Sequence, residues 1–367
     1  MNTKLMLKNF KCFDELSVDL SPLTVLTGLN GMGKSTVIQA ILLLWQSLKH
    51  AIENKPRIIL NGDLAHLGSA SSVFCEDAND DVFYIILYRK IKTYLKANYD
   101  AANGFINAKI SPSASNYNAY LSDLKYINAE RIGPKSFYNM SDDKTIESKQ
   151  LGISGEYAIH YLHKFRDEKI SSKKLAHPKE ESLTLESQVN AWLSEISPGT
   201  SLRITAYDNM SLMNLEYSFA TSTHRSKNFT SSHVGFGLTY ALPVIVSILS
   251  AKPGSLIIVE NPEAHIHPQG QSMIGQLISK AASDGIQIIV ETHSDHLLNG
   301  VRVAAYHDLI PADDILFYFF TRKENTVGTR STCKKIQIDS SGRITEWPIG
   351  FFDEWENNLE ILIKPKK

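Results

Sequence analysis

The sequence predicts an α/β protein built on a mostly parallel sheet, with a mixed β and helical insertion between its two halves. A glycine-rich turn joins a β-rich run, Leu23–Thr27, to an apolar helix that begins at Lys34. Further along, the four apolar residues of Leu256–Val259 are followed by a carboxylate. From Gly237 onward, helix patterns alternate with strand patterns, which is typical of parallel sheets flanked by helices.

Length and composition restrict the class of protein. The chain has 367 residues, 43% of them hydrophobic, so it can bury a sizeable core. A net charge of −1 argues against a surface coated with positive charge for nucleic acid and leaves a local basic patch open. The 3 cysteines are far apart and indicate no disulfide framework. No apolar stretch reaches the ~20 residues of a membrane span, so we expect a cytoplasmic protein.

The glycine-rich turn carries a phosphate-binding motif. Gly28–Ser35 has the sequence GLNGMGKS and matches the P-loop pattern G-x-x-x-x-G-K-[ST] in full. Glycines let backbone N–H groups turn towards phosphates, and the following helix adds the positive end of its dipole. We expect Lys34 to reach the β- and γ-phosphates of ATP and Ser35 to bind Mg²⁺. The nucleotide-binding residues that this motif predicts are Asn30, Gly31, Met32, Gly33, Lys34, Ser35 and Thr36.

Two later motifs supply further polar side chains. Leu256–Val259 has the pattern of a buried strand that delivers Glu260 to Mg²⁺ at the carboxyl edge of the sheet, as a Walker-B acid does. The strand that follows ends in Glu291-Thr292-His293. We expect His293 to hydrogen-bond the γ-phosphate and to sense its loss. The nearby His265, His267 and His296 are interpreted as structural and not as a zinc site.

Periodicity places the other elements. Ser111–Tyr120 is polar and is interpreted as a loop, and the highly charged stretch Lys164–Glu181 is interpreted as a solvated surface. Strands are predicted at Val82–Tyr88, Thr93–Asn98, Phe105–Ile110, Leu212–Phe219, Leu256–Val259, Ile286–Val290 and Ile315–Phe320, helices at Lys34–Leu48, Gly155–Phe165, Gln188–Ile196, Gly237–Leu249, Gln271–Ala282 and Ser294–Val303, and a small hairpin at Ile336–Ile349.

Together, GLNGMGKS, VENPEAHIHP and ETHSDH resemble the ABC/SMC-like branch of the P-loop NTPases. Within that branch the chain is similar to the OLD-type ATPases, and more so to stand-alone AAA ATPases with a short uncharacterised C-terminal module. The likeness spans most of the chain and is weakest at Cys75–Leu124. Its further segments are Tyr126–Pro134, Gly155–Tyr157, Val234–Gly237 and Trp347–Asp353.

The resemblance implies an ATPase head that dimerises head-to-tail around two ATP molecules. A signature segment of one subunit then touches the γ-phosphate that the other subunit holds. The matching segment is Ser231–Gly237, in which Val234 stands where a serine is usual, so Ser232, Gly235 and Gly237 are the candidate contacts. We therefore expect a homodimer or a higher homo-oligomer.

A second departure from the family concerns catalysis. The usual Walker-B pair is Asp-Glu, whereas this chain has Glu260-Asn261. An asparagine can orient water but cannot accept its proton, so Glu263 is the nearest alternative base. Because losing a general base costs roughly 10²–10⁴-fold in rate, we expect slow hydrolysis, with ATP acting mainly to hold a dimer together.

The resemblance also suggests a biological setting. Related ATPases occur in bacterial antiphage defence systems with a separately encoded effector, and this sequence shows no Asp-x-Asp pattern of a Toprim nuclease domain after His293. The main hypothesis is therefore an ATP-driven switch that controls a partner, with nuclease as the expected class. An SMC-like DNA repair or recombination ATPase is the alternative, and binding of DNA or RNA stays open.

The motifs also suggest a division of the chain. We expect an N-terminal ATPase lobe with the P-loop, an insertion, a C-terminal ATPase lobe with the later motifs, and a tail. The corresponding ranges are 1–75, 76–230, 231–335 and 336–367.

Overall fold

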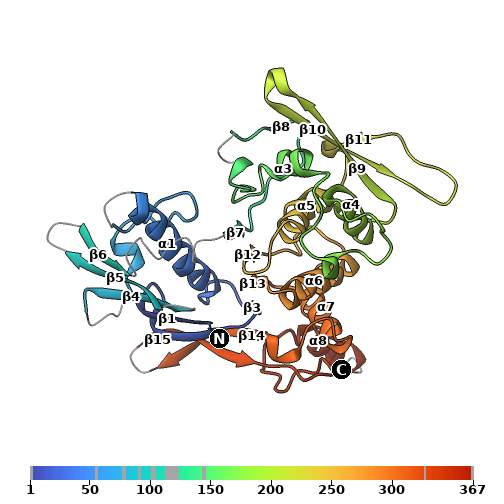
Figure 1. Cartoon of the computed structure of the whole chain (residues 1–367). Helices are drawn as coiled ribbons and strands as arrows, with labels where there is room; N and C mark the ends of the chain where they lie inside the picture. The colour runs from blue at the N-terminus through green and yellow to red at the C-terminus, as the bar shows by residue number, and fades with distance from the viewer. Residues whose placement is uncertain are drawn as a thin grey trace.

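The computed structural model describes residues 3–53, 57–76, 80–89, 92–100, 105–111, 124–142, 146–325 and 328–364. Within these residues the strands form three sheets, and a six-stranded sheet lies at the centre of the molecule (Figure 1). One apolar core lies on each face of this central sheet. Every helix in the described residues is too short or too polar to cross a membrane.

The central sheet has the strand order β15-β14-β3-β13-β12-β7. Neighbours from β14 to β7 are parallel, and β15 pairs antiparallel with β14 at one edge. Because parallel strands end at the same edge, the P-loop and the acids of the later motifs come together there. The bounds are β3 Leu23–Gly28, β7 Leu124–Ile127, β12 Leu256–Glu260, β13 Gln287–Glu291, β14 Ile315–Asn325 and β15 Gly328–Ile336.

An antiparallel sheet of order β2-β1-β4-β5-β6 covers helix α1 on one side of the central sheet. Its inner residues alternate with more exposed ones, as expected for strands with one buried face. Helix α1 is apolar almost all round because it lies between the two sheets. The bounds are β1 Thr3–Phe10, β2 Phe13–Leu20, α1 Lys34–Glu53, β4 Val82–Tyr88, β5 Lys92–Asp100 and β6 Phe105–Ser111.

Five helices share the core on the opposite side of the central sheet, and the most buried of them is α5. It contains Pro243 and is almost uniformly apolar, which suits a helix enclosed by its neighbours. The bounds are α3 Ala158–Phe165, α4 Leu185–Ile196, α5 Phe236–Leu249, α6 Pro268–Ser283 and α7 Asp295–Tyr306.

A third sheet and a C-terminal helix complete the fold. In the third sheet β10 pairs with β8, β9 and β11, and α8 near the chain end buries none of its residues. The bounds are β8 Tyr138–Asn139, β9 Thr200–Tyr207, β10 Leu212–Phe219, β11 Phe229–Thr230 and α8 Glu354–Ile363, with 3₁₀ turns η1 Ser71–Val73, η3 Lys173–Leu175, η4 Asp208–Met210, η5 Ser231–His233 and η6 Ala312–Asp314.

The predicted α/β fold of the P-loop type is confirmed, and each predicted helix and strand is present within a few residues of its expected bounds. Strands β7, β8, β9, β11 and β15 and helix α8 are additions to the prediction. The expected hairpin at Ile336–Ile349 is reduced to a single bridge between Ile338 and Ile344. Of the predicted loop Ser111–Tyr120, all but Ser111 lies outside the described residues. The four-part division of the chain stays a prediction.

Candidate nucleotide-binding site

The P-loop runs from the end of β3 to the first turn of α1, and two of its glycines lie against neighbours that leave no room for a side chain. Gly28 has a φ of 128°, and a Cβ there would lie 2.3 Å from the backbone oxygen of Phe320. Gly33 has a φ of 102°, and its Cβ would lie 2.5 Å from the ring of Phe13. Both positions require glycine, because only glycine combines positive φ with so close an approach. The loop therefore presents its backbone at the sheet edge.

The two functional side chains of the motif face an acidic partner. Lys34 is 3% exposed, and its Nζ donates to the carbonyls of Gly28 (2.9 Å) and Leu29 (2.8 Å). It also lies 3.8 Å from a carboxylate oxygen of Glu291. Ser35 Oγ approaches both oxygens of the same carboxylate, at 2.9 and 3.1 Å. The sequence motif thus places a cation and a hydroxyl beside Glu291.

Glu260 and Glu291 are register partners at the ends of β12 and β13. Tyr126 on β7 donates its hydroxyl to Glu260 at 2.9 Å. Burial raises the pKa of Glu260. Burial, together with the charge of Glu260, raises the pKa of Glu291 to about 7. Two carboxylates held this close in a buried place favour a divalent cation beside them.

Asn261 and Glu263 lie within three residues of Glu260. Asn261 has a φ of 44°, a left-handed conformation that asparagine tolerates better than most residues, and its N–H donates to the carbonyl of Glu291 at 2.7 Å. Glu263 accepts the backbone N–H of His293 at 2.9 Å. Asn261 Oδ1 and Glu263 Oε2 are buried without a hydrogen-bond partner. Such atoms fit a water or a ligand that this site would hold.

Arg131 supports the backbone of these acids from a buried position. Its guanidinium, 3% exposed, donates to the carbonyl of Glu260 at 2.9 Å and to that of Asn261 at 2.6 and 3.2 Å. The same group lies 5.8 Å from the ring centre of Tyr240 on α5. Burial lowers its pKa to about 10, so it stays charged at neutral pH. Arg131 therefore connects helix α5 to the turn that follows Glu260.

The predicted signature segment lies on the surface at the start of α5. Ser231 is fully buried, its Oγ donating to the carbonyl of Lys135 at 2.7 Å, whereas Ser232 is exposed. A Cβ on Gly235, the N-cap of α5, would meet nothing within 4 Å, but one on Gly237 would lie 2.6 Å from the backbone oxygen of His265. Gly237 is thus needed for packing, while Ser232 and Gly235 are accessible to a second molecule.

His293 is exposed beside the P-loop. Burial of part of its ring and the charge of Lys34 lower its pKa, which favours the neutral imidazole at pH 7. Across the residues that the structure describes, no three His, Cys, Asp or Glu side chains gather as a metal site.

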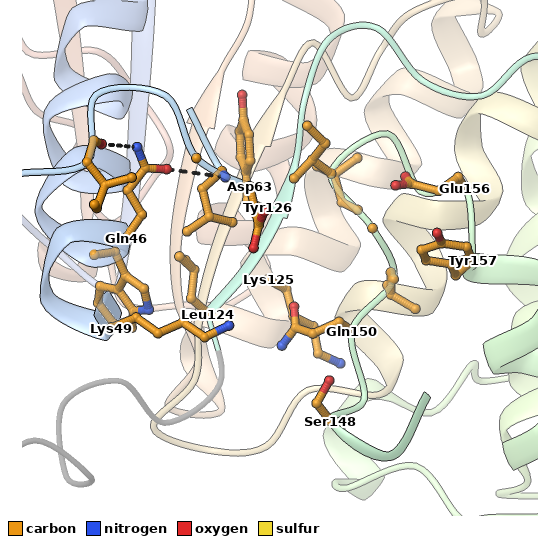
Figure 2. A pocket seen from close by; sticks show the side chains of 18 of the residues that line it. Gln46, Lys49, Asp63, Leu124, Lys125, Tyr126, Ser148, Gln150, Glu156 and Tyr157 are labelled. Carbon is orange, nitrogen blue, oxygen red and sulfur yellow. Dashed lines mark hydrogen bonds between the residues drawn. The ribbon is translucent and has the colours of Figure 1, made fainter. Parts of the chain in front are cut away.

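Tyr126 also lines a cavity of about 940 Å³, whose lining residues do not include the P-loop (Figure 2). Figure 2 shows Lys49 of α1 reaching into it from one side and Gln150 and Tyr157 lining the other. Trp45, which also lines it, lies eleven residues after Lys34, or roughly 16 Å along the helix. Among the residues that line this cavity, Tyr126 connects it to the nucleotide-binding site, because its hydroxyl donates to Glu260.

The residues present fit ATP and Mg²⁺. Lys34 and the glycine-rich backbone provide a phosphate cradle, and Ser35, Glu260 and Glu291 provide oxygen ligands of the kind Mg²⁺ prefers. The motifs assign no role in the site to Glu291 or Tyr126. Arg131, which the sequence offers as a contact to nucleotide or partner or as a structural salt bridge, donates instead to backbone carbonyls. A carboxylate at the end of the strand next to Walker B is a feature that could have identified Glu291. Tyr126 and Arg131 act through contacts more than 120 residues apart in sequence.

A family model described as "AAA ATPase domain" matches residues 1–195 of the 367. The chain belongs to the AAA ATPase domain family. A second AAA domain model, whose description names the AbiEii toxin and type IV toxin–antitoxin systems, matches residues 202–299 of this AAA ATPase. A family described as a protein of unknown function matches residues 310–362.

Individual relatives agree with this assignment. The OLD nuclease of Thermus scotoductus (strain ATCC 700910 / SA-01) is 24% identical over 324 residues, which are 80% of this chain and 59% of that protein. The chain thus spans under two thirds of that relative's length. The resemblance to OLD-type ATPases is confirmed.

Solved structures of SMC heads share the fold. An SMC head bound to the C-terminal winged-helix domain of ScpA matches with a TM-score of 0.55, at 14% identity over 91% of this chain and 98% of that one. An SMC head with an extended coiled coil, bound to the C-terminal domain of ScpA from Pyrococcus furiosus, matches with a TM-score of 0.50, at 13% identity over 99% of both chains. The ABC/SMC-like head architecture is therefore confirmed.

Proposed function

We propose that this AAA ATPase binds ATP with Mg²⁺, hydrolyses it slowly, and works as a switch that dimerises in the ATP-bound state. The observation that carries the proposal is the placement of Lys34 and Ser35 against Glu291, beside Glu260. A lysine, a hydroxyl and two carboxylates at a P-loop are the groups that Mg²⁺-nucleotide binding requires.

Each residue has a distinct task in this proposal. Lys34 moves from the loop carbonyls to the phosphates, which offer it a stronger charge-assisted bond. Ser35, Glu260 and Glu291 hold Mg²⁺, which would neutralise the charge of the phosphates. His293 donates to the γ-phosphate from its exposed place beside Lys34.

Slow hydrolysis follows from the groups next to Glu260. Asn261 places an amide where a base is usual, and it can orient water through its unpartnered Oδ1. Glu263 is held by the backbone N–H of His293, and its raised pKa makes it a better base than an ordinary carboxylate. We assign the water-activating role to these two residues together.

Dimerisation is proposed through the exposed signature segment. Ser232 and Gly235 lie on the surface, and the exposed ring of Phe236 extends it. The backbone N–H groups at the start of α5 are suited to an anion such as the γ-phosphate held by a second subunit.

We also propose that the switch controls a separately encoded effector, with nuclease as the class, in bacterial antiphage defence. Support comes from the matched relative, which is named a nuclease, and from the described elements of this chain, which belong to an ATPase head and its tail. Direct action on DNA as an SMC-like repair ATPase is the alternative.

Native mass measurement tests the proposal, with and without ATP–Mg²⁺ and with Lys34→Ala as the control that cannot hold the phosphates. We expect an ATP-dependent dimer for the wild type alone, and a steady-state turnover below the ~10 s⁻¹ that is typical of enzymes. Identical masses of wild type and Lys34→Ala in ATP would reject the switch.

Co-expression with the product of the neighbouring gene tests the effector. A stable complex whose nuclease activity depends on ATP supports it. A chain that binds no neighbour but whose ATPase activity DNA stimulates supports the repair alternative.

A further inference from the structure

The outer face of the antiparallel sheet carries a regular arrangement of lysines and tyrosines. One row runs across four strands as Lys8, Tyr84, Lys96 and Lys109, each the register partner of the next. A second row runs as Lys4, Tyr88 and Lys92. Between the two rows lies Tyr94, opposite Ile86. We call these eight residues the lysine–tyrosine face: Lys4, Lys8, Tyr84, Tyr88, Lys92, Tyr94, Lys96 and Lys109.

This face is open to solvent. Along each strand its residues alternate with fully buried ones that pack on α1, such as Leu5, Leu7, Phe83 and Ile85. All eight members are exposed or partly exposed, and Lys8, Lys92 and Lys109 are the most exposed.

The charge on the face is positive in a chain whose net charge is −1. On the edge strand β2, Glu15 is the register partner of Lys8 and Asp19 is the register partner of Lys4. Asp19 is already paired with Lys335 at 2.9 Å. In the described part of the chain, none of the five lysines of the face forms an ion pair. Lys92, Lys96 and Lys109 have no carboxylate as a register partner, so their charge is available to an external anion.

One detail indicates that an anion belongs there. Lys96 and Lys109 lie directly opposite each other on β5 and β6. Like charges in such a pair destabilise a sheet, and an anionic ligand would relieve the repulsion. The lysines also lie against the tyrosines: Lys92 Nζ is 5.4 Å from the ring centre of Tyr88, and Lys96 Nζ is 5.4 Å from that of Tyr84. Cation and aromatic ring are thus presented together.

The spacing matches a flexible polyanion that carries flat rings. Neighbouring strands are about 4.8 Å apart, so the first row spans about 14 Å. Positions four apart on one strand, such as Tyr84 and Tyr88, are about 13 Å apart. Sheets that bind single-stranded nucleic acid combine aromatic rings for stacking bases with a basic surface for phosphates. A duplex conceals the faces of its bases and could use only the lysines.

We propose that the lysine–tyrosine face binds single-stranded nucleic acid, the tyrosines stacking on bases and the lysines contacting phosphates. The lysine–tyrosine face is the side of the antiparallel sheet that points away from α1. The proposal therefore goes beyond the switch function and does not depend on it. Binding is expected without nucleotide, which keeps its test separate from that of the ATPase.

Fluorescence anisotropy with the full chain tests the proposal, using fluorescein-labelled oligothymidylate and oligouridylate of about 20 nucleotides and a duplex of equal length, without ATP. We expect both single strands to bind at least 10-fold more tightly than the duplex. Failure of both single strands to bind at low salt would overturn the proposal, as would equal or tighter binding of the duplex.

Two double variants test the lysines. Lys92→Glu with Lys109→Glu reverses two exposed charges on the face, and Lys173→Glu with Lys174→Glu reverses two exposed charges on η3. We expect the first to weaken binding at least 10-fold and the second less than 3-fold. Loss of two phosphate contacts should also reduce the salt slope by about 1.4. Equal weakening by both double variants would overturn the assignment.

Tyr94→Leu tests stacking, because it keeps an apolar β-sheet residue and all charges. Loss of one stacked base is expected to weaken binding by about 5- to 100-fold without changing the salt slope. If Tyr94→Leu and Tyr88→Leu both bind like wild type, the face does not stack bases. Binding to vesicles rich in phosphatidylserine in place of the oligonucleotides would assign the face to a membrane surface and also overturn the proposal.

Discussion

Glu260 and Glu291 stand side by side at the ends of two neighbouring parallel strands, and the hydroxyl of Ser35 is bound to the second of them. The Walker-B pattern in the sequence predicts Glu260 as a Mg²⁺ ligand. The hydrogen bonds of Ser35 identify Glu291 as a second candidate ligand. The site thus has two acids where a single Walker-B acid is expected. Their shared burial raises the pKa of both, which leads to a prediction about pH.

Without metal, Glu291 should make stability fall as pH rises. Its pKa is about 7 in the folded chain and near 4.5 when unfolded, so the folded state binds the proton more tightly. The resulting loss of unfolding free energy is small below pH 4.5 and grows between pH 4.5 and 7. Above pH 7 it reaches its full value, on the order of 3 kcal/mol. Thermal unfolding in EDTA should show Glu291→Gln matching the wild type in unfolding free energy near pH 4 and exceeding it at pH 8. Parallel pH curves for the two proteins would contradict this origin.

Asn261→Glu should accelerate hydrolysis. It adds a carboxylate at the position where a base is usual, and we expect turnover to rise at least 10-fold, within the roughly 10²–10⁴-fold that a general base contributes. Steady-state phosphate release at saturating ATP measures this. Asn261→Ala is the control and should not exceed wild type. An unchanged rate in Asn261→Glu, with ATP still bound, would assign the base to Glu263.

Arg131→Gln should lower turnover more than nucleotide affinity. Arg131 donates to the carbonyls of Glu260 and Asn261 but is not one of the groups proposed to touch ATP. We expect a fall of about 10- to 100-fold in kcat, equivalent to about 1.4–2.8 kcal/mol, and a change below about 3-fold in the Kd for ATP. Arg131→Lys, which retains the charge, should recover part of the rate. An equal loss in kcat and affinity would indicate general damage to the site.

Gly235→Ala and Gly237→Ala form a matched pair. At Gly237 the added methyl meets the backbone of His265, so we expect a loss of about 1–3 kcal/mol in unfolding free energy. At Gly235 the methyl meets nothing, and stability should stay within about 1 kcal/mol. If the signature segment faces a second subunit, Gly235→Ala should nevertheless weaken the ATP-dependent dimer. Thermal unfolding and native mass measurements on both variants distinguish the two effects.

The sequence could predict those site residues that belong to a motif of consecutive residues. Lys34 and Ser35 follow from one turn, and Glu260 from a buried strand, because each role depends on neighbours in the chain. The support given by Arg131 could not be predicted, since a side chain that binds two carbonyls some 130 residues away leaves no periodic pattern.

The same reasoning explains the fold. Helix α1 and strands β3, β12, β13 and β14 of the central sheet are apolar because they are enclosed, so their patterns were clear. Strand β15 was missed because Gly328–Ile336 is an edge strand rich in Thr, Arg and Lys, which lacks the apolar alternation of a half-buried strand. Helix α8 was missed because it has no buried face to impose a pattern.

The β1–β2 hairpin lies directly beneath Gly33, with the ring of Phe13 and the sulfur of Cys12 filling the space that a side chain at Gly33 would need. The shape of the P-loop is thus set in part by two residues that no nucleotide-binding motif includes. Natural variation at positions 12 and 13 should be constrained together with position 33. A survey of related chains that compares only the P-loop motif would therefore classify as functional some proteins that lack the residues supporting the loop at Gly33.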